Sequence, residues 1–110
     1  MMHKEIYLKE AEEIAQKKIQ ELSEFSNLEL TIMNDATIEF EYGWMFFYQS
    51  EEYVRTGDES KLIGGNAPLI VDKFLSKLYV TGTRMGEEFY IEKYCELRES
   101  PEEFEKEISA

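Results

Sequence analysis

The apolar residues near the start of the chain predict an amphipathic helix. From residue 3 to residue 24 they recur at three- and four-residue steps, while lysines and glutamates fill most other positions. The predicted buried positions are Leu8, Ala11, Ile14, Ala15, Ile19 and Leu22. The helix is expected to end at the polar stretch 23–27, which interrupts the periodicity and turns the chain.

Five short segments after this helix predict β-strands. Apolar and polar residues alternate in 28–33 and in 37–41, as they do in strands with one buried face. Segment 44–48 is apolar at every position, and segments 69–71 and 78–80 are predicted to pair as a hairpin. Together these segments predict a small, mainly antiparallel sheet of about four strands.

The aromatic segment 44–48 predicts a central strand. Trp44, Phe46 and Tyr48 would point to one face of the sheet and Met45 and Phe47 to the other, because side chains alternate along a strand. A strand with two apolar faces needs cover on both sides. If the N-terminal helix covers one face, the other is left to a second helix, to a second copy of the chain or to a partner.

A second helix is predicted over residues 86–98. Its buried residues are expected to be Ile91, Tyr94 and Cys95, with Tyr90 beside them. Free cysteines are among the most often buried residues, so we interpret Cys95 as a buried thiol.

A short tail helix is predicted over residues 100–110. Ser100 is followed three residues later by a glutamate, which is the spacing of a capping box, and Pro101 occupies the first helical position, where proline is favoured. Phe104 and Ile108 would anchor this helix on the rest of the chain.

These elements predict an α+β fold. An N-terminal amphipathic helix packs on a small, mainly antiparallel sheet of about four strands, with one or two C-terminal helices. A length of 110 residues is common for a single domain. We therefore expect residues 1–110 to form one domain.

The net charge excludes some classes of partner. It is −12, so the chain should repel the phosphate backbone of nucleic acids and anionic membrane surfaces. Residues 28–55 and residues 84–110 each carry a net charge of −5, and such a surface favours rapid association with a basic protein. No apolar run approaches the roughly 20 residues of a membrane span, and the N-terminus lacks a signal sequence, so we expect a cytoplasmic protein.

The reactive residues do not favour an enzyme. The only histidine, His3, lies near the N-terminus, and the only cysteine, Cys95, lies in an acidic segment that would raise its pKa. A single cysteine cannot form an intramolecular disulfide or a cysteine-rich metal site. The glycine-rich stretch 64–68 leads into a strand instead of a helix, so it does not match a phosphate-binding loop. We expect no catalytic residues, no metal and no cofactor.

An ordered set of short motifs carries a family resemblance. The motifs are residues 37–39 (TIE), 42–48 (YGWMFFY), 53 (Y), 56–58 (TGD), 65–72 (GNAPLIVD), 78–83 (LYVTGT) and 90–94 (YIEKY). In this order and at these separations they resemble the YrhB-like family, which is also called the immunity protein 35 family. The resemblance covers roughly residues 5–97.

The resemblance implies a bacterial cytoplasmic protein of α+β fold, grouped with immunity proteins that neutralise the toxin domains of polymorphic toxin systems by stoichiometric binding. Its shared residues are interpreted as fold determinants, and they are Gly43, Trp44, Gly65, Asn66, Pro68 and Asp72. Where the family usually has a polar, glycine-containing hairpin, this chain has Phe74, Leu75 and Ser76. The apolar pair either packs back under a helix or forms a tip that contacts a partner.

The resulting hypothesis is an immunity protein whose acidic surface blocks a basic site on a cognate toxin. Such a toxin could be a nuclease, with carboxylates standing where phosphates would bind. The residues expected to contact it are Glu39, Glu41, Glu51, Glu52 and Phe74. Two other hypotheses stay open: a holdase-like module with an exposed aromatic sheet face, and a dimeric structural domain in which a second copy closes that face.

Overall fold

The structure is a computed structural model that describes residues 5–109, so His3 lies outside the described residues. The elements, in chain order, are α1 (Leu8–Ser26), β1 (Leu30–Ile32), η1 (Asn34–Ala36), β2 (Ile38–Phe40), β3 (Gly43–Phe46), β4 (Tyr48–Ser50), α2 (Glu51–Thr56), η2 (Glu59–Lys61), β5 (Leu69–Asp72), β6 (Leu78–Val80), α3 (Glu87–Leu97) and α4 (Pro101–Ser109). This order confirms the predicted α+β fold.

All strand pairs in the described residues are antiparallel, and they form two sheets. The larger sheet has four strands in the order β2-β3-β5-β6, and the smaller sheet pairs β1 with β4. In the larger sheet Gly43 lies opposite Asp72 and Trp44 opposite Val71. Strands β5 and β6 form the predicted hairpin.

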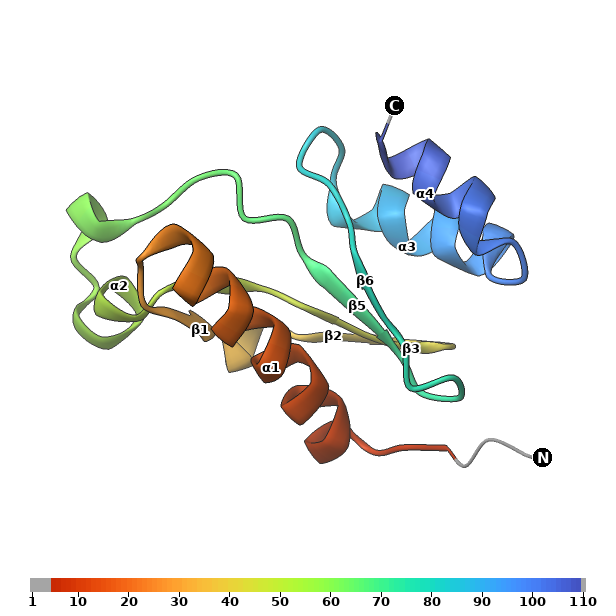
Figure 1. Cartoon of the computed structure of the whole chain (residues 1–110), viewed down its shortest axis with the longest axis horizontal. Helices are drawn as coiled ribbons and strands as arrows, with labels where there is room; N and C mark the ends of the chain where they lie inside the picture. The colour runs from red at the N-terminus through yellow and green to blue at the C-terminus, as the bar shows by residue number, and fades with distance from the viewer. Residues whose placement is uncertain (1–4, 110) are drawn as a thin grey trace.

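Helices cover both faces of the four-stranded sheet. Figure 1 shows α1 on one side of the sheet and α3 with α4 on the other. Trp44 and Phe46 pack under α1 with Ala11, Ala15 and Ile19, whereas Met45 packs with residues of α3 and α4. The predicted alternation of the aromatic strand is therefore confirmed. The second face is closed by the chain's own C-terminal helices, which was one of the three alternatives.

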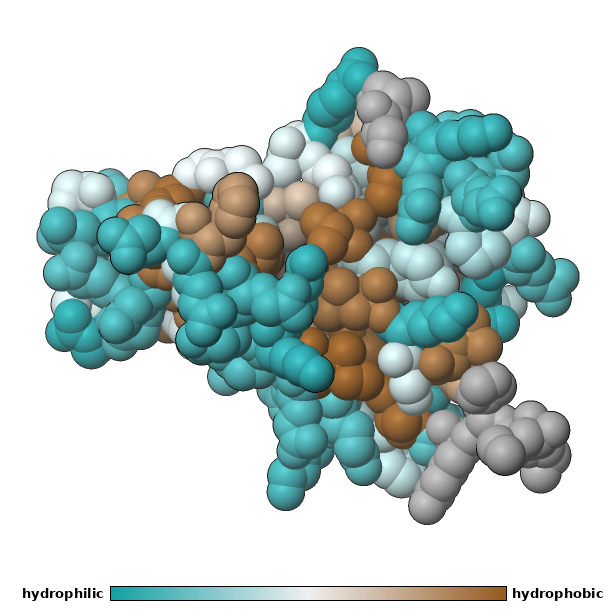
Figure 2. All heavy atoms as spheres, viewed as in Figure 1, coloured by the Kyte–Doolittle hydropathy of each residue, from teal (hydrophilic) through white to brown (hydrophobic). Residues whose placement is uncertain are grey.

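The outer surfaces of the helices are polar. On the face drawn in Figure 2, hydrophilic residues cover α1 and the C-terminal helices, and hydrophobic residues gather in a band between them, over β5 and β6. This distribution is what an amphipathic helix packed on a sheet produces.

The aromatic segment differs from the prediction in one respect. It is divided at Phe47, where the chain passes from the larger sheet, as β3, to the smaller sheet, as β4. The Phe47 carbonyl accepts a hydrogen bond from the Met33 N–H at 2.8 Å, so pairing with the β1 side begins there. A pattern of apolar residues cannot reveal such a change of partner, because both strands are equally apolar.

The boundaries of the first helix also differ from the prediction. Helix α1 begins at Leu8 instead of residue 3, because Tyr7 has extended backbone and acts as the N-cap residue. The Glu10 side chain accepts a hydrogen bond from the Tyr7 N–H at 3.0 Å, as in a capping box. The helix continues to Ser26 and ends where Asn27 adopts a left-handed conformation, with φ of 60°.

The buried side of α3 is formed by tyrosines. Tyr90 and Tyr94 are each 2% exposed, and the partly buried Ile91 packs against the same cluster, as predicted. Cys95 is only partly buried and belongs to neither core cluster of the described residues, so the prediction of a buried thiol was wrong. Tyr94 makes edge-to-face or tilted ring contacts with Phe40, Tyr79 and Phe104.

The two residues predicted to anchor the tail helix α4 are confirmed. Phe104 is fully buried, and Ile108 packs against the same cluster, so both anchor α4 as expected.

Gly43 allows β3 and β5 to lie close together. A side chain built at this position would overlap the carbonyl oxygen of Val71 on the neighbouring strand. Because that atom belongs to the backbone, it cannot move aside without separating the strands. Glycine at this position thus permits the close approach of two paired strands.

Replacing Gly43 by alanine should therefore destabilise the fold. Overpacked sites typically cost about 1–3 kcal/mol, and a clash with backbone in a central strand pair belongs at or above the upper end. The matched control is Gly64→Ala, where no atom lies near the added methyl group and φ is not positive. Urea denaturation of both variants would measure the difference; equal midpoints would contradict the close-approach account.

Candidate partner-binding surface

The five predicted contact residues lie in three different places. Glu39 belongs to β2 and Glu41 to the turn between β2 and β3, whereas Glu51 and Glu52 start α2. Phe74 lies in the turn between β5 and β6. The predicted acidic residues thus do not form one cluster. Glu51 and Glu52 line one groove and Glu41 lines another, whereas Glu39 lines neither.

The first region is a groove beside α2, here called the α2 groove. It has a volume of about 450 Å³, and its lining includes Leu28, Ile63 and the two glutamates. Each glutamate faces a cation of the same chain: Glu51 lies 3.3 Å from Arg55, and Glu52 lies 3.5 Å from Lys61. The charges of these two glutamates are therefore balanced locally, whereas Glu29, which also lines the groove, has no lysine or arginine of the described residues within ion-pair distance.

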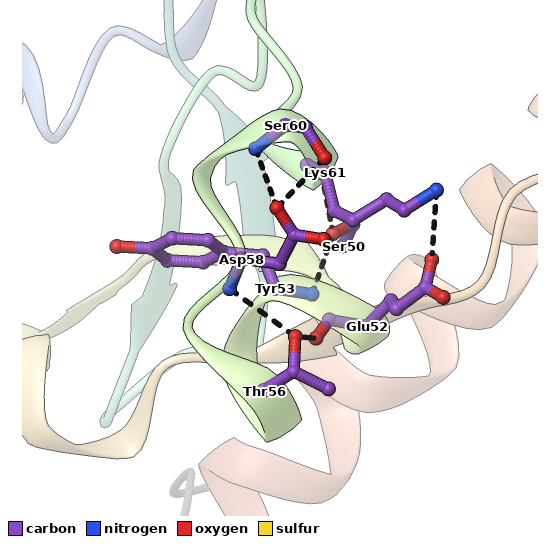
Figure 3. A network of polar contacts seen from close by, with 7 residues as sticks. All are labelled: Ser50, Glu52, Tyr53, Thr56, Asp58, Ser60 and Lys61. Atoms are coloured by element: carbon purple, nitrogen blue, oxygen red, sulfur yellow. Dashed lines mark hydrogen bonds and ion pairs between the residues drawn. The ribbon is translucent and has the colours of Figure 1, made fainter.

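A network of hydrogen bonds fixes the shape of this region. The Ser50 hydroxyl accepts from the Tyr53 N–H at 3.0 Å and donates to the Lys61 carbonyl at 2.7 Å, which ties the start of α2 to η2. Asp58 accepts from the N–H and the hydroxyl of Ser60 and so caps η2. Figure 3 shows the Lys61 and Glu52 side chains extended toward each other across this network.

The second region is a groove between the β2–β3 turn and α3, here called the α3 groove. It has a volume of about 650 Å³. Its lining residues are Glu41, Tyr42, Phe89, Ile91, Glu92, Lys93, Cys95 and Glu96. Half of them provide apolar or weakly polar surface, and three of the others are glutamates. One predicted contact residue, Glu41, lies here.

The charges of the α3 groove are poorly balanced. Lys93 lies at 3.9 Å from Glu96, and it is the one cation among the lining residues. Within residues 5–109, no lysine or arginine lies within ion-pair distance of Glu41 or Glu92. The groove therefore presents net negative charge around an apolar floor. Sequence reasoning did not select Glu92 and Glu96, although the net charge of −5 in residues 84–110 was a signal for this region.

Glu39 lies on β2, the outer strand of the larger sheet, and already forms an ion pair. Its carboxylate is 3.5 Å from the Lys73 ammonium, which also sits 5.2 Å from the centre of the Trp44 ring. Lys73 thereby links the β2 edge to the aromatic strand. Its side chain is 14% exposed, while that of Glu39 is 69% exposed, so solvent reduces the strength of the ion pair.

Phe74 packs back on the protein. It is half-buried, and the Arg98 guanidinium lies 5.6 Å from the centre of its ring. Its N–H donates to Asp72 at 2.8 Å, which holds the turn in place. The structure thus corresponds to the first of the two alternatives for Phe74, packing against the end of a helix.

Asp72 is the most connected side chain of the described chain and is fully buried. Its Oδ1 accepts from the N–H groups of Phe74 and Leu75, and its Oδ2 accepts from the Tyr94 hydroxyl at 2.5 Å. Arg98 donates to both oxygens, at 2.7 Å from Nε and 3.1 Å from Nη2. The carboxylate therefore joins the β5–β6 turn to α3.

The ionisation of Asp72 follows from these contacts. Burial alone would raise the pKa of Asp72, but the hydrogen bonds from Arg98, Tyr94 and the two backbone N–H groups outweigh burial and hold this pKa below its ordinary value. Burial, followed by the hydrogen bond to Asp72, raises the pKa of Tyr94, so its hydroxyl stays protonated and donates. The buried charge is paired and fully hydrogen-bonded.

The Gly65–Pro68 part of the family motif holds a long connection against the sheets. The Asn66 side chain donates to the Tyr48 carbonyl at 2.7 Å, and Gly65 has φ of 74°, which favours glycine. The Pro68 carbonyl accepts from both the N–H and the hydroxyl of Thr81. These contacts place the connection beside β4 and β6.

The described residues form neither a metal-binding cluster nor a reactive thiol. Burial raises the pKa of the Cys95 thiol, and Glu41 raises it further, which disfavours the reactive thiolate. Residues 5–109 contain no group of three or more His, Cys, Asp or Glu side chains placed to hold a metal ion. None of the helices in this part of the chain has the length and apolarity needed to cross a bilayer.

Comparison with known proteins decides the family. The model of the family described as immunity protein 35 matches residues 9–85, which is more than half of the chain. This chain belongs to the immunity protein 35 family. A relative, the uncharacterized protein YrhB of Escherichia coli strain K12, is 38% identical over 55 residues, which are 50% of this chain and 58% of the relative.

The immunity protein 35 match includes the β2–β3 turn and Asp72 but ends before α3. The α3 groove is thus formed partly by family sequence and partly by sequence outside the match. The chain spans little more than half the length of the YrhB relative. No solved structure matches this chain.

Asp72 should make stability depend on acid pH. The pKa of Asp72 is lower in the folded state than in the unfolded state. Its carboxylate therefore contributes fully to folding stability above the unfolded-state pKa of about 4, and this contribution is lost as the pH falls through the folded-state pKa. Asp72→Asn should lower the free energy of unfolding by about 3–5 kcal/mol at neutral pH, because it leaves Arg98 without its buried partner. It should also flatten the acid dependence, as measured by urea denaturation at a series of pH values.

The control for this prediction is Asp35→Asn, which changes an exposed aspartate. This variant should keep both the wild-type stability and its acid dependence. If Asp72→Asn and Asp35→Asn gave the same curve, the ion pair with Arg98 would not stabilise the fold.

Proposed function

We propose that this protein is an immunity protein that binds and neutralises a cognate toxin domain. The observation that carries the proposal is membership of the immunity protein 35 family. Neutralisation would be stoichiometric, because an immunity protein acts by occupying a surface of the toxin and needs no catalytic residue. Proteins of this family are generally non-catalytic, and we propose no enzymatic activity here.

The partner would be a toxin with a basic functional site. A net charge of −12 attracts a positively charged protein over a distance and accelerates its encounter. If the toxin is a nuclease, carboxylates such as Glu39 and Glu41 would occupy positions where nucleic-acid phosphates bind. The exposed position of both residues, near the outer strand of the sheet, supports this proposal.

The fold does not support the reason for the other two hypotheses. Both the holdase-like module and the dimeric structural domain depended on an uncovered face of the aromatic strand. Trp44 is 5% exposed, and Met45 and Phe46 are fully buried under the helices of the same chain. An aromatic face for unfolded clients, or for a second copy, would require one of these helices to leave the sheet.

A pull-down with the tagged protein from its native cell extract tests the proposal. Mass spectrometry should identify one stoichiometric partner that carries a toxin domain, and the complex should persist in size-exclusion chromatography. Recovery of many unrelated proteins, or of this protein alone, would contradict the immunity function.

Charge reversal on the β2 side should weaken that complex. The double variant Glu39→Lys with Glu41→Lys should lose at least tenfold in affinity, or about 1.4 kcal/mol, because two carboxylates that attract the toxin would then repel it. Calorimetric titration with the purified toxin domain would measure the change. Glu39→Lys also removes the ion pair with Lys73, so circular dichroism should first show that the fold is intact.

The matched control for this variant is Glu13→Lys with Glu24→Lys. Both glutamates are exposed on α1, and the change in net charge is the same. An equal loss of affinity in both double variants would show that total charge matters and that Glu39 and Glu41 are not contacts.

A further inference from the structure

We propose that the α3 groove is the docking site for the toxin, and that it takes a toxin segment in which an arginine or lysine is followed by an apolar side chain. The inference rests on the proposed function for the identity of the partner. It goes beyond that function by choosing one of the acidic regions and by stating the chemistry of what enters it.

The residues of α3 that line the groove form parallel rows. Phe89 and Lys93, Ile91 and Cys95, and Glu92 and Glu96 are three pairs at the i, i+4 spacing, which places each pair on one line along the helix surface. The intervening Tyr90 and Tyr94 point into the core. The side of α3 that lines the groove therefore combines the partly buried Phe89, Ile91 and Cys95 with a row of two carboxylates, and is not a uniformly polar surface.

Two aromatic rings of the groove already contact cations of the same chain. Tyr42 forms the wall opposite α3, and the Arg98 guanidinium lies 4.4 Å from the centre of its ring. The Lys93 ammonium lies 5.9 Å from the centre of the Phe89 ring. Aromatic rings that hold cations from within the chain show that this surface suits the methylene stem and charged head of a basic residue.

Charge complementarity distinguishes the two grooves. In the α2 groove both predicted contact glutamates have an arginine or lysine of the same chain at 3.3–3.5 Å, so an incoming basic side chain must compete with it. In the α3 groove Glu41 and Glu92 face no such competitor within the described residues. A basic residue entering there gains attraction from two glutamates without ion pairs, against one, Glu29, in the α2 groove, and this difference favours the α3 groove.

The walls of the groove are also held in place before any partner arrives. The Tyr42 carbonyl accepts from the Lys73 N–H at 2.8 Å, and Arg98, which stacks on the Tyr42 ring, is fixed by Asp72. The turn and α3 are thereby joined through one buried carboxylate. A preformed groove loses little conformational entropy on binding, which favours affinity.

The first test needs no toxin. Titration of the isotope-labelled protein with the peptide acetyl-Arg-Leu-Arg-Leu-Arg-Leu-amide should shift the NMR amide signals of residues 41–42 and 89–96 in a saturable manner. The peptide acetyl-Arg-Gly-Arg-Gly-Arg-Gly-amide has the same charge and should bind at least several-fold more weakly, because it lacks the apolar side chains. Shifts centred on the α2 groove, or equal binding of both peptides, would overturn the proposal.

Paired variants locate the interaction. Glu41→Gln with Glu92→Gln should weaken binding of the Arg-Leu peptide about tenfold. Glu51→Gln with Glu52→Gln removes the same charge from the α2 groove and should leave the affinity unchanged. Glutamine is nearly isosteric with glutamate, so both variants should fold. A larger loss in the α2 pair would overturn the choice of groove.

Cys95 supplies a second readout with the toxin itself. It is the only cysteine of the chain and lines the α3 groove, so a bound toxin should protect it from iodoacetamide at mildly alkaline pH. Alkylation of free Cys95 should in turn block complex formation. If the toxin still bound the protein with alkylated Cys95, and also bound the Glu41 and Glu92 variants, the α3 groove would not be the docking site. The proposed immunity function would then be unaffected. A pull-down without a toxin partner would instead overturn the function, and with it the partner assigned to the groove.

Discussion

The buried carboxylate of Asp72 is the contact on which the arrangement of the C-terminal half depends. It lies at the end of the central strand β5, opposite Gly43, and receives hydrogen bonds from the following turn and from Tyr94 and Arg98 of the C-terminal region. Because a buried charge without partners is strongly unfavourable, the turn and α3 can occupy only positions that satisfy it. One side chain thus fixes two elements that are distant in sequence.

The same contact connects the core to the surface proposed to bind a toxin. Arg98 reaches Asp72 with its guanidinium and stacks on Tyr42 and Phe74, so the β2–β3 turn, the β5–β6 turn and the end of α3 meet at one point. The α3 groove opens between two of these elements. Its negative charge is only partly balanced, by Lys93, whereas Glu39, Glu51 and Glu52 each lie beside a cation of the same chain. Folding and recognition would therefore use different carboxylates, one buried and several exposed.

The sequence predicted those features that depend on local pattern. Alternation along the aromatic strand correctly assigned Trp44 and Met45 to opposite faces of the sheet. Periodicity correctly placed Ala11 and Ile19 on the buried face of the first helix. Features that depend on distant partners were not predictable, such as the passage of the chain between sheets at Phe47 or the pairing of Asp72 with Arg98. Among the site residues, Glu41 was selected from composition, but the Glu92 beside it depends on how α3 crosses the sheet, which no local pattern encodes.

Hydrogen–deuterium exchange of the protein, free and bound to its toxin partner, would locate the toxin-binding surface. Binding should protect amides in residues 41–42 and 89–96, while the amides of β3 and β5 exchange slowly in both states because the core does not change. Protection confined to residues 50–61 or to α1, with the α3 groove exchanging as in the free protein, would contradict this prediction.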